Sequence, residues 1–382
     1  MSTADQLVDA NAAIAAPRPL AKTKHLPALD GLRALSVLLV MVSHAGLGDL
    51  VPGGLGVTVF FFISGFLITR LLLEEHESKG SIAFLRFYTR RFLRLGPALV
   101  VYVAIASAAL IVVGGVFSLA DTFAALLYYA NYYQIFGDFQ HVTVATPAGE
   151  AVRLNSPFSI LWSLAIEEHF YLLFPLTLSL LAGNLKRGLW VFVAALFMVL
   201  AWRLVLVSHA NAHDRIYMGT DTRIDSLLYG VIAAIAARRM GARFASWGKL
   251  TLAAFAIGSV LLVGSLLLRD PAFRETYRYS LQGVALSAIV PALVFAPSLS
   301  LFRRALELPL LTYLGKLSYS LYLYQYLVVM LASWFCATRG LPQYGVIWIV
   351  IFAALTLLLA VASYHGVEQP FLKWRRRLDS TA

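Results

Sequence analysis

Long uncharged apolar runs recur along the whole chain, among them residues 96–120, 250–268 and 345–364. Each run is long enough for a helix to cross the hydrocarbon core of a bilayer, which is about 30 Å thick and takes about 20 helical residues. Backbone groups in lipid must satisfy their own hydrogen bonds, so the runs are predicted to be helices. The alternation of apolar and polar residues that marks a barrel strand is absent. The pattern therefore predicts an all-α polytopic membrane protein with about ten transmembrane helices.

The predicted helices belong to one membrane domain over residues 26–372. Their approximate positions are 29–49, 54–73, 96–117, 159–182, 188–208, 223–237, 250–268, 280–296, 313–335 and 344–364. Residues 1–25 are polar and Ala-rich and lack the apolar core of a cleaved signal peptide, so they are predicted to form a disordered cytoplasmic tail. Residues 373–382 are predicted to form a basic cytoplasmic tail. The longest predicted loop, 117–158, is too short for a separate domain.

Composition excludes an ordinary water-soluble protein. Hydrophobic residues make up 60% of the 382 positions and charged residues only 13%, against roughly 45–50% and about 25% in soluble domains. The single cysteine, Cys336, excludes an internal disulfide and any multi-cysteine metal site.

The formal net charge of +11 is explained by topology. If the N-terminus is cytoplasmic, most of the lysines and arginines fall on the cytoplasmic side of the predicted spans, as the positive-inside rule expects. We therefore predict no nucleic-acid partner. Both termini are expected in the cytoplasm, and the chain in the lipid bilayer of a bacterial inner (plasma) membrane.

The first span carries the most informative charged residues, Arg33 and His44. They lie about three full helical turns apart, so they share one helix face at a separation of about 16 Å. This spacing suits one extended ligand, or two tasks at different depths. Arg33, near the cytoplasmic surface, can hold a phosphate or carboxylate, and the deeper His44 can take a proton from a hydroxyl. In the alternative interpretation Arg33 snorkels to the interface, Asp30 caps the helix and His44 bonds a carbonyl.

The second and third spans add polar and basic residues that are candidates for ligand binding. Ser64, beside Gly65, allows close approach of a ligand or simply of another helix. Residues 84–97 interleave basic and aromatic side chains at the cytoplasmic interface, which is typical of an amphipathic membrane-surface segment. Arg91 and Arg94 lie one turn apart within it and could clamp a polyphosphate. Both roles can hold together.

The fourth and sixth spans place charge inside the bilayer, at a cost of about 2.5–3.5 kcal/mol per residue on insertion scales. The neighbouring carboxylates Glu167 and Glu168 are not explained by packing, and one of them is expected to be protonated or paired with an arginine. Adjacent residues on a helix diverge by about 100°, which argues against a metal site. Arg223 and Asp225 are candidates for the pairing network.

Taken together, the motifs resemble the membrane acyltransferase-3 family, whose members O-acylate sugars, lipids, antibiotics and cell-envelope polymers. The first matching segments are Leu29-Asp-Gly-Leu-Arg33 with its interval to His44, Phe62-Ile-Ser-Gly-Phe-Leu-Ile68, and Arg90-Arg-Phe-Leu-Arg-Leu-Gly-Pro97. The later ones are Trp162-Ser-Leu-Ala-Ile-Glu-Glu168, Thr222-Arg-Ile-Asp-Ser-Leu-Leu-Tyr-Gly230, Gly315-Lys-Leu-Ser-Tyr-Ser-Leu-Tyr-Leu323 and Glu368-Gln-Pro370. They occur in the family's order over nearly the whole chain.

The resemblance implies an acyl-coenzyme A donor, His44 as the essential residue with Arg33 as its partner, and Arg91 and Arg94 assisting with the donor. No permanently bound cofactor is expected. The family often has a histidine where this chain has Gln325, and an arginine or similar residue where it has His365, so neither position is assigned a catalytic role. Some relatives carry a fused extracytoplasmic hydrolase-like domain. Since this chain ends at Ala382, we expect none here, and an acyl relay would require a separate extracytoplasmic partner protein.

The sequence thus predicts a membrane O-acyltransferase that moves an acyl group, with acetyl favoured, from acyl-coenzyme A to a hydroxyl of a cell-envelope carbohydrate or glycolipid. His44 acts as general base or covalent relay, with Glu167 or Glu168 orienting it or pairing with Arg33. The predicted catalytic residues are His44, Arg33, Glu167 and Glu168. The predicted substrate-binding residues are Asp30, Ser64, Arg91, Arg94, Trp162, Tyr171, Arg223 and Asp225. The alternative is a multi-pass transporter that uses the buried Arg/His/Glu network.

Overall fold

A computed structural model describes residues 25–137, 141–145, 151–209, 212–241 and 246–380. A long helix lies at each of the ten predicted spans. These helices are α2 (Pro27–Val42), α3 (Gly53–Lys79), α4 (Phe84–Val112), α7 (Trp162–Leu181), α8 (Leu185–Leu206), α10 (Thr220–Met240), α12 (Gly248–Leu267), α14 (Tyr277–Phe295), α16 (Pro309–Ala337) and α17 (Val346–Ser363). The predicted disordered tail lies almost wholly outside the described residues. The predicted C-terminal tail is helical through Ser380 as part of α18 (Gln369–Ser380).

Shorter elements connect the long helices. The short α-helices are α5 (Leu119–Leu126), α6 (Ala130–Phe136), α9 (Ala212–Met218), α13 (Pro271–Glu275) and α15 (Ser300–Leu306). The 3₁₀ turns are Ser159–Leu161, Ala182–Asn184 and Pro297–Leu299, and π-helical turns occur at Ser43–Leu47 and Tyr364–Glu368. The strands β1 (His141–Ala145) and β2 (Ala151–Asn155) form an antiparallel hairpin in which His141 pairs with Asn155. This hairpin is a small addition to the predicted all-α fold.

Within the described residues, eight helical segments are long and apolar enough to cross a membrane. One of them, Ser159–Leu206, contains both α7 and α8. α10 falls outside this set because charged residues crowd its two ends. They are Asp221, Arg223, Asp225, Arg238 and Arg239. The prediction of an all-α polytopic membrane protein is confirmed.

The predicted amphipathic surface segment 84–97 is not a separate element. Its arginines belong to the first turns of α4, which continues through Pro97 to Val112. Proline is tolerated inside long membrane helices because neighbouring groups can satisfy the freed backbone carbonyl. α4 therefore carries its basic residues into the helix bundle, where they can face other helices.

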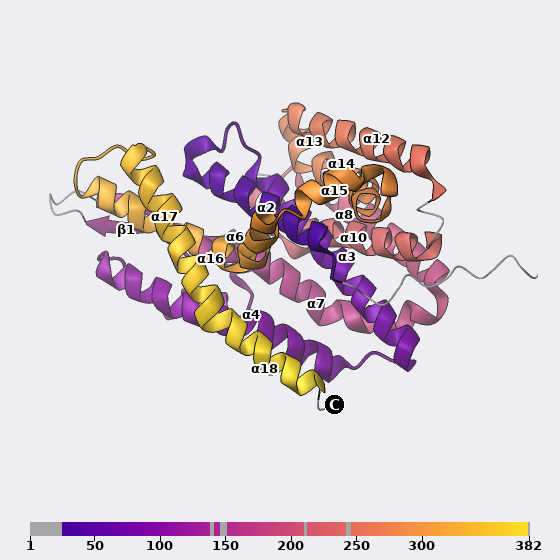
Figure 1. Cartoon of the computed structure of the whole chain (residues 1–382). Helices are drawn as coiled ribbons and strands as arrows, with labels where there is room; N and C mark the ends of the chain where they lie inside the picture. The colour runs from indigo at the N-terminus through magenta and orange to yellow at the C-terminus, as the bar shows by residue number, and fades with distance from the viewer. Residues whose placement is uncertain (1–24, 138–140, 146–150, 210–211, 242–245, 381–382) are drawn as a thin grey trace, which may run out of the picture.

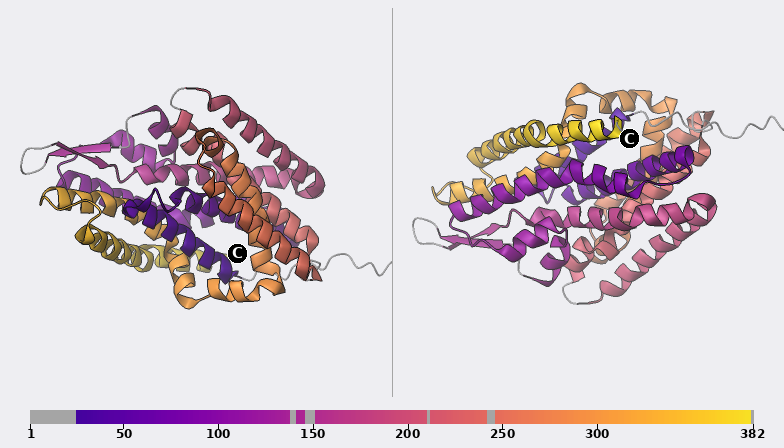
Figure 2. Two further views of the ribbon diagram at one scale, coloured as in Figure 1. Left: turned by 90° about the horizontal axis from the view of Figure 1, so that it is seen from above. Right: turned by 90° about the horizontal axis from the view of Figure 1, so that it is seen from below.

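The long helices pack side by side in a bundle. α3 lies between α2 and α10, and α16 packs along α2. Figure 1 shows β1 at one end of the molecule and the C-terminus of α18 at the other, and Figure 2 shows α18 running beside α4. We call the end at which α3 ends and α4 begins the basic end, and the opposite one the hairpin end.

Glycines allow α3 and α10 to approach within backbone contact. A Cβ on Gly65 would lie 2.1 Å from the Leu227 carbonyl oxygen of α10, and one on Gly230 would lie 2.1 Å from the Phe62 carbonyl oxygen of α3. No side chain fits at either distance. Small residues at such crossings let helices pack closely in membranes, where lipid removes the hydrophobic driving force between them.

Substituting Gly65 with leucine is therefore expected to separate α3 from α10 and to lower the melting temperature in detergent by several degrees, with reduced yield of folded protein. Gly264→Leu is the matched control, since a Cβ there meets no atom within 4 Å. Size-exclusion chromatography with thermal unfolding reports both variants. Equal melting temperatures for Gly65→Leu and the wild type would show that this crossing tolerates a gap.

Candidate functional site

A cavity of about 190 Å³ opens between α2, α3, α4, α7 and α16 at the basic end. Four guanidinium groups line it, with Tyr171 and Tyr319 among the other polar residues. The four are Arg33, Arg70, Arg91 and Arg94. Two of the lining residues are carboxylates, Asp30 and Glu167. An excess of cationic groups over carboxylates makes this a site for an anionic ligand.

Arg91 is the arginine that the two glutamates bind. Its Nε donates to Glu168 Oε1 at 3.1 Å, and its Nη2 lies 3.6 Å from Glu167 Oε2. The guanidinium also stacks on the Tyr171 ring, 3.4 Å from the centroid. Ser64 Oγ donates to Glu167 Oε1 at 2.7 Å. Ser64 thus reaches the polar network of the cavity while Gly65 makes the helix contact.

As predicted, the glutamates are paired with an arginine, but this arginine is Arg91 and not Arg33. Among the described residues, neither Glu167 nor Glu168 forms an ion pair with Arg33 or a hydrogen bond with His44. The physical reason is helix placement: α7 presents the two carboxylates to α4, where Arg91 carries the opposite charge. The glutamates neutralise one arginine of the cavity and leave others for a ligand.

Three arginines of the cavity keep donors available. Within the described part of the chain, no hydrogen bond or ion pair joins Arg33 or Arg94 to a carboxylate. Arg70 is only 8% exposed, and its Nη1 has no hydrogen-bond partner. A buried guanidinium donor without a partner is costly, so an anion entering the cavity would satisfy it. Asp30 is occupied by His25, whose Nε2 lies 2.7 Å from Oδ2.

Two neighbouring cavities continue the first. The larger, about 410 Å³, shares Arg91 and Arg94 with it and reaches α18. The smaller, about 50 Å³, shares Arg33, Glu167 and Tyr319 and extends to Phe60 and Tyr322, further toward the hairpin end. These shared lining residues place the three cavities next to one another, in a series from the basic end into the bundle that we call the path.

His44 lies beyond this path, at the hairpin end of the first span. It belongs to the π-helical turn Ser43–Leu47, which follows α2 and contains Gly46 at a φ of 91°. Its Nδ1 lies 3.4 Å from Gln325 Oε1, and its ring meets Tyr326 edge-on at 5.0 Å. Gln325, which the sequence left without a role, is therefore the polar partner of His44. Both it and Tyr326 lie about one helical turn beyond Tyr322 on α16.

Arg223 and Asp225 do not line the arginine cavity. Arg223 donates to the Tyr217 carbonyl and to Thr58 Oγ1, both at 3.2 Å, and stacks on Tyr279. The partner of Asp225 is Arg203, whose Nη2 lies 2.7 Å from Oδ2 with both side chains fully buried. Both side chains are held by neighbouring helices, and the substrate contact predicted for them stays a prediction.

Trp162 is also a packing residue in this structure. Its indole lies 4.8 Å from the Tyr217 ring and meets Phe61 edge-on at 6.3 Å. It is 6% exposed and lines none of the three cavities described above. These ring contacts hold α3, α7 and α9 together, and the predicted role of Trp162 in substrate binding stays a prediction.

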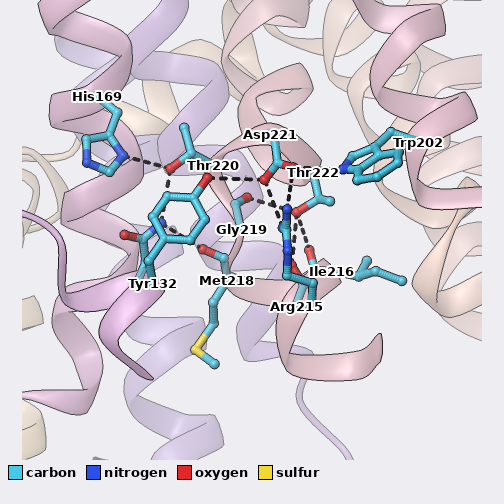
Figure 3. Close-up of polar contacts among 11 residues, drawn as sticks. Tyr132, His169, Trp202, Arg215, Ile216, Met218, Gly219, Thr220, Asp221 and Thr222 are labelled. Atoms are coloured by element: carbon cyan, nitrogen blue, oxygen red, sulfur yellow. Dashed lines mark hydrogen bonds and ion pairs between the residues drawn. The ribbon is translucent and has the colours of Figure 1, made fainter. Parts of the chain in front are cut away.

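A second polar network links neighbouring helices where α10 begins (Figure 3). Arg215 forms two hydrogen bonds to Asp221, at 2.8 and 2.5 Å, and Asp221 also accepts from Trp202 Nε1 at 2.7 Å. His169 Nδ1 lies 2.7 Å from Thr220 Oγ1. These groups satisfy one another and tie α7, α8 and α9 to α10. We interpret the network as structural.

Sequence reasoning missed Arg70, Tyr319 and Gln325 as site residues. Arg70 was interpreted as a topology signal, although a buried arginine in a span always calls for a partner. Tyr319 and Gln325 stood out only as neutral polar groups in an apolar helix. Their neighbours on α2 and α4 could not be identified without knowing how the helices are rotated.

Comparisons with known proteins show to which family this chain belongs. A family model described as an acyltransferase domain matches residues 26–365. The O-acetyltransferase OatA of Staphylococcus aureus strain NCTC 8325 is 32% identical over 363 residues, or 92% of this chain. Another Staphylococcus aureus protein, from strain COL, whose name marks its O-acetyltransferase activity as provisional, is 32% identical over 362 residues. The chain covers 58% of the length of each of these relatives. No solved structure matches the chain. With the family model matched from residue 26 to residue 365, the chain belongs to the acyltransferase-3 family.

Proposed function

We propose that this protein is a membrane O-acyltransferase that transfers an acyl group, with acetyl favoured, from coenzyme A to a hydroxyl of a cell-envelope carbohydrate or glycolipid. The observation that carries the proposal is the arginine cavity, in which Arg33 and Arg94 have no carboxylate bound among the described residues and Arg70 Nη1 has no hydrogen-bond partner. The names of the relatives support transfer of an acetyl group to oxygen.

The donor phosphates occupy the arginine cavity. Guanidinium groups bind phosphate oxygens through paired hydrogen bonds and remain charged at any physiological pH. The thiol arm of the donor is linear and largely uncharged, which fits the narrow cavity between Phe60, Ser318 and Tyr322. This arm carries the thioester from the phosphates toward His44.

His44 is placed to act as the general base. The side-chain oxygen of Gln325 only accepts hydrogen bonds, so the contact at 3.4 Å favours the tautomer with the proton on Nδ1. Nε2 then keeps its lone pair and takes the proton of the acceptor hydroxyl. The hydroxyl oxygen attacks the thioester carbonyl, the carbon–sulfur bond breaks, and the thiolate leaves and receives the proton from the imidazolium. The products are an ester and free coenzyme A.

The basic end faces the cytoplasm in this proposal. Its arginines follow the positive-inside rule, and coenzyme A is a cytoplasmic metabolite. The acceptor approaches His44 from the hairpin end, on the other side of the membrane. A polar acceptor such as a sugar presents several hydroxyls there, of which the one nearest Nε2 reacts.

Gln325 acts as a positioning residue, so Gln325→Leu is expected to lower kcat on the order of tenfold while KM for acetyl-coenzyme A stays unchanged. Leucine keeps the volume but cannot fix the His44 tautomer. Steady-state kinetics of the purified protein measure both constants. If KM rises and kcat is unaffected, Gln325 belongs to the donor site and not to the base.

The proposal is tested with purified protein in proteoliposomes, labelled acetyl-coenzyme A and an envelope-glycan extract. Release of free thiol together with ester-linked label on the glycan supports acyl transfer. Movement of glycan across the membrane without any thiol release would support the transporter instead. Neither thiol release nor glycan movement with several acyl-coenzyme A donors would contradict the proposed donor.

A further inference from the structure

A further cavity, of about 210 Å³, lies at the hairpin end of the molecule, and we call it the hairpin cavity. It lies between β2, the last turns of α16 and the loop that leads into α17, which Figure 1 shows at the same end as β1. Its polar lining residues are Arg153, Asn155, Ser333 and Gln343. Arg153 and Gln343 are exposed, so the cavity opens at the surface of the protein.

The lining of the hairpin cavity suits a ligand rich in hydroxyl groups. Asn155 and Gln343 carry amides, which both donate and accept hydrogen bonds, and Ser333 carries a hydroxyl. In the part of the chain that the structure describes, no carboxylate lines this cavity, so it lacks the ligands that Ca²⁺ or Mg²⁺ prefers. Arg153 is the single cation of this lining, against four in the cavity at the basic end. Sugars, whose hydroxyls donate and accept in turn, match these groups better than phosphates do.

Hydrogen bonds hold one wall of the hairpin cavity in place. Gln343 Nε2 donates to Ser333 Oγ at 3.2 Å, and the buried Trp348 Nε1 donates to the same oxygen at 3.1 Å. These two bonds use the lone pairs of the Ser333 oxygen, so its own proton is directed away from them. The amide oxygen of Gln343 is not used in this pair. The wall is therefore fixed while it still carries groups that can bind a ligand.

Tyr344, the neighbour of Gln343, connects the hairpin cavity to the turn that carries His44. Its ring packs on Gly46, where an added Cβ would lie 2.7 Å from Tyr344 Cγ. Its phenol also interacts with that of Tyr326, whose ring meets His44 edge-on. Tyr344 has a φ of 61°, a conformation that a bulky residue adopts only where its surroundings hold it. The hairpin cavity and His44 thus belong to one packed unit.

The separation between the hairpin cavity and His44 sets the length of a ligand that reaches both. Tyr326, at His44, and Ser333, in the cavity, both belong to α16. They lie two helical turns apart, so they share one helix face at a separation of about 10 Å. A single sugar ring is too short to bind in the cavity and also present a hydroxyl to His44. Consecutive units of a carbohydrate chain can make both contacts.

We propose that the hairpin cavity is the acceptor subsite, which binds one unit of a carbohydrate chain while another unit of the same chain presents its hydroxyl to His44. Asn155, Ser333 and Gln343 bind the hydroxyls of the anchored unit. This inference rests on the proposed O-acyl transfer and adds the class of acceptor: an oligosaccharide or longer chain, rather than a single sugar.

The dependence of activity on acceptor length tests this assignment. The full chain in detergent, which leaves both ends accessible, is given labelled acetyl-coenzyme A with single sugars or with longer fragments, both released from the envelope-glycan extract and separated by size. Wild type is expected to show a kcat/KM about tenfold or more higher for the longer fragments, because only these reach the additional hydrogen-bonding groups. In the double variant Asn155→Ala and Gln343→Ala, the kcat/KM for longer fragments is expected to fall to that for single sugars. Arg339→Ala, an exposed change at the same end outside the cavity lining, is the control and should keep the preference.

Equal kcat/KM values of the wild type for single sugars and longer fragments would overturn the inference and leave the proposed function intact. A double variant that keeps the preference for longer fragments would place the acceptor subsite elsewhere. One that loses activity equally with all acceptors would show that these residues support the fold or His44 and do not bind the chain. Absence of thiol release with every acceptor would instead contradict the proposed function, and this inference with it. Should the double variant fold poorly, the exposed single change Gln343→Ala carries the same comparison.

Discussion

Replacing His44 with alanine is expected to lower kcat for acetyl transfer about a thousandfold, because a positioned general base contributes roughly 10²–10⁴ to rate. Among the described residues, Gln325 makes the hydrogen bond and Tyr326 the ring contact of His44, and neither can take its place as a base near neutral pH. The binding of coenzyme A should remain, since the phosphate site proposed for it lies at the other end of the path. Thiol release and calorimetric binding measure the two properties separately.

His169→Ala is the matched control for this variant. His169 also lies in a membrane helix, but its partner is Thr220 and the network around it is structural. We expect its loss to reduce stability more than kcat per folded molecule. If His169→Ala and His44→Ala lose the same activity, His44 has no special place in the chemistry.

The double substitution Arg33→Ala and Arg94→Ala is expected to raise KM for acetyl-coenzyme A by about 100-fold or more. Each charge-assisted hydrogen bond to phosphate contributes about 1.5–3 kcal/mol, and 1.4 kcal/mol corresponds to a factor of ten. Neither arginine is ion-paired with a carboxylate in the described structure, so their removal leaves no buried carboxylate without its partner. The fold should therefore persist.

Arg239→Ala, an exposed change at the end of α10, provides the control for total charge. It lies outside all the cavities described above. The dependence of KM on salt should weaken in the double variant and remain in Arg239→Ala. A double variant with wild-type KM would show that the phosphates bind elsewhere.

The helices of this protein could be predicted because a membrane span needs a long apolar run, and each run is visible in the sequence. Which charged side chains pair with one another could not be predicted from the sequence. Glu167 meets Arg91 and not Arg33 because α7 faces α4, a relation set by side-chain packing between distant segments. Asp225 is bound by Arg203, which lies outside every motif.

The two ends of the candidate site illustrate the same limit. Arg33 and His44 were expected on one helix face, yet the bundle gives them different surroundings: Arg33 lines two cavities, and His44 meets α16 beyond them. The glutamine partner of His44 could have been suspected, since a neutral amide inside a membrane helix needs a hydrogen-bond partner. Which residue pairs with His44 could be identified only from the packing of the helices.

The most direct measurement encloses the acceptor glycan in sealed vesicles that carry the protein in one orientation, with labelled acetyl-coenzyme A added only outside the vesicles. The account predicts ester-linked label on the enclosed glycan when the basic end faces outward. It predicts none for His44→Ala. Label that appears on glycan only when donor and acceptor share one side would contradict transfer through the bundle past His44.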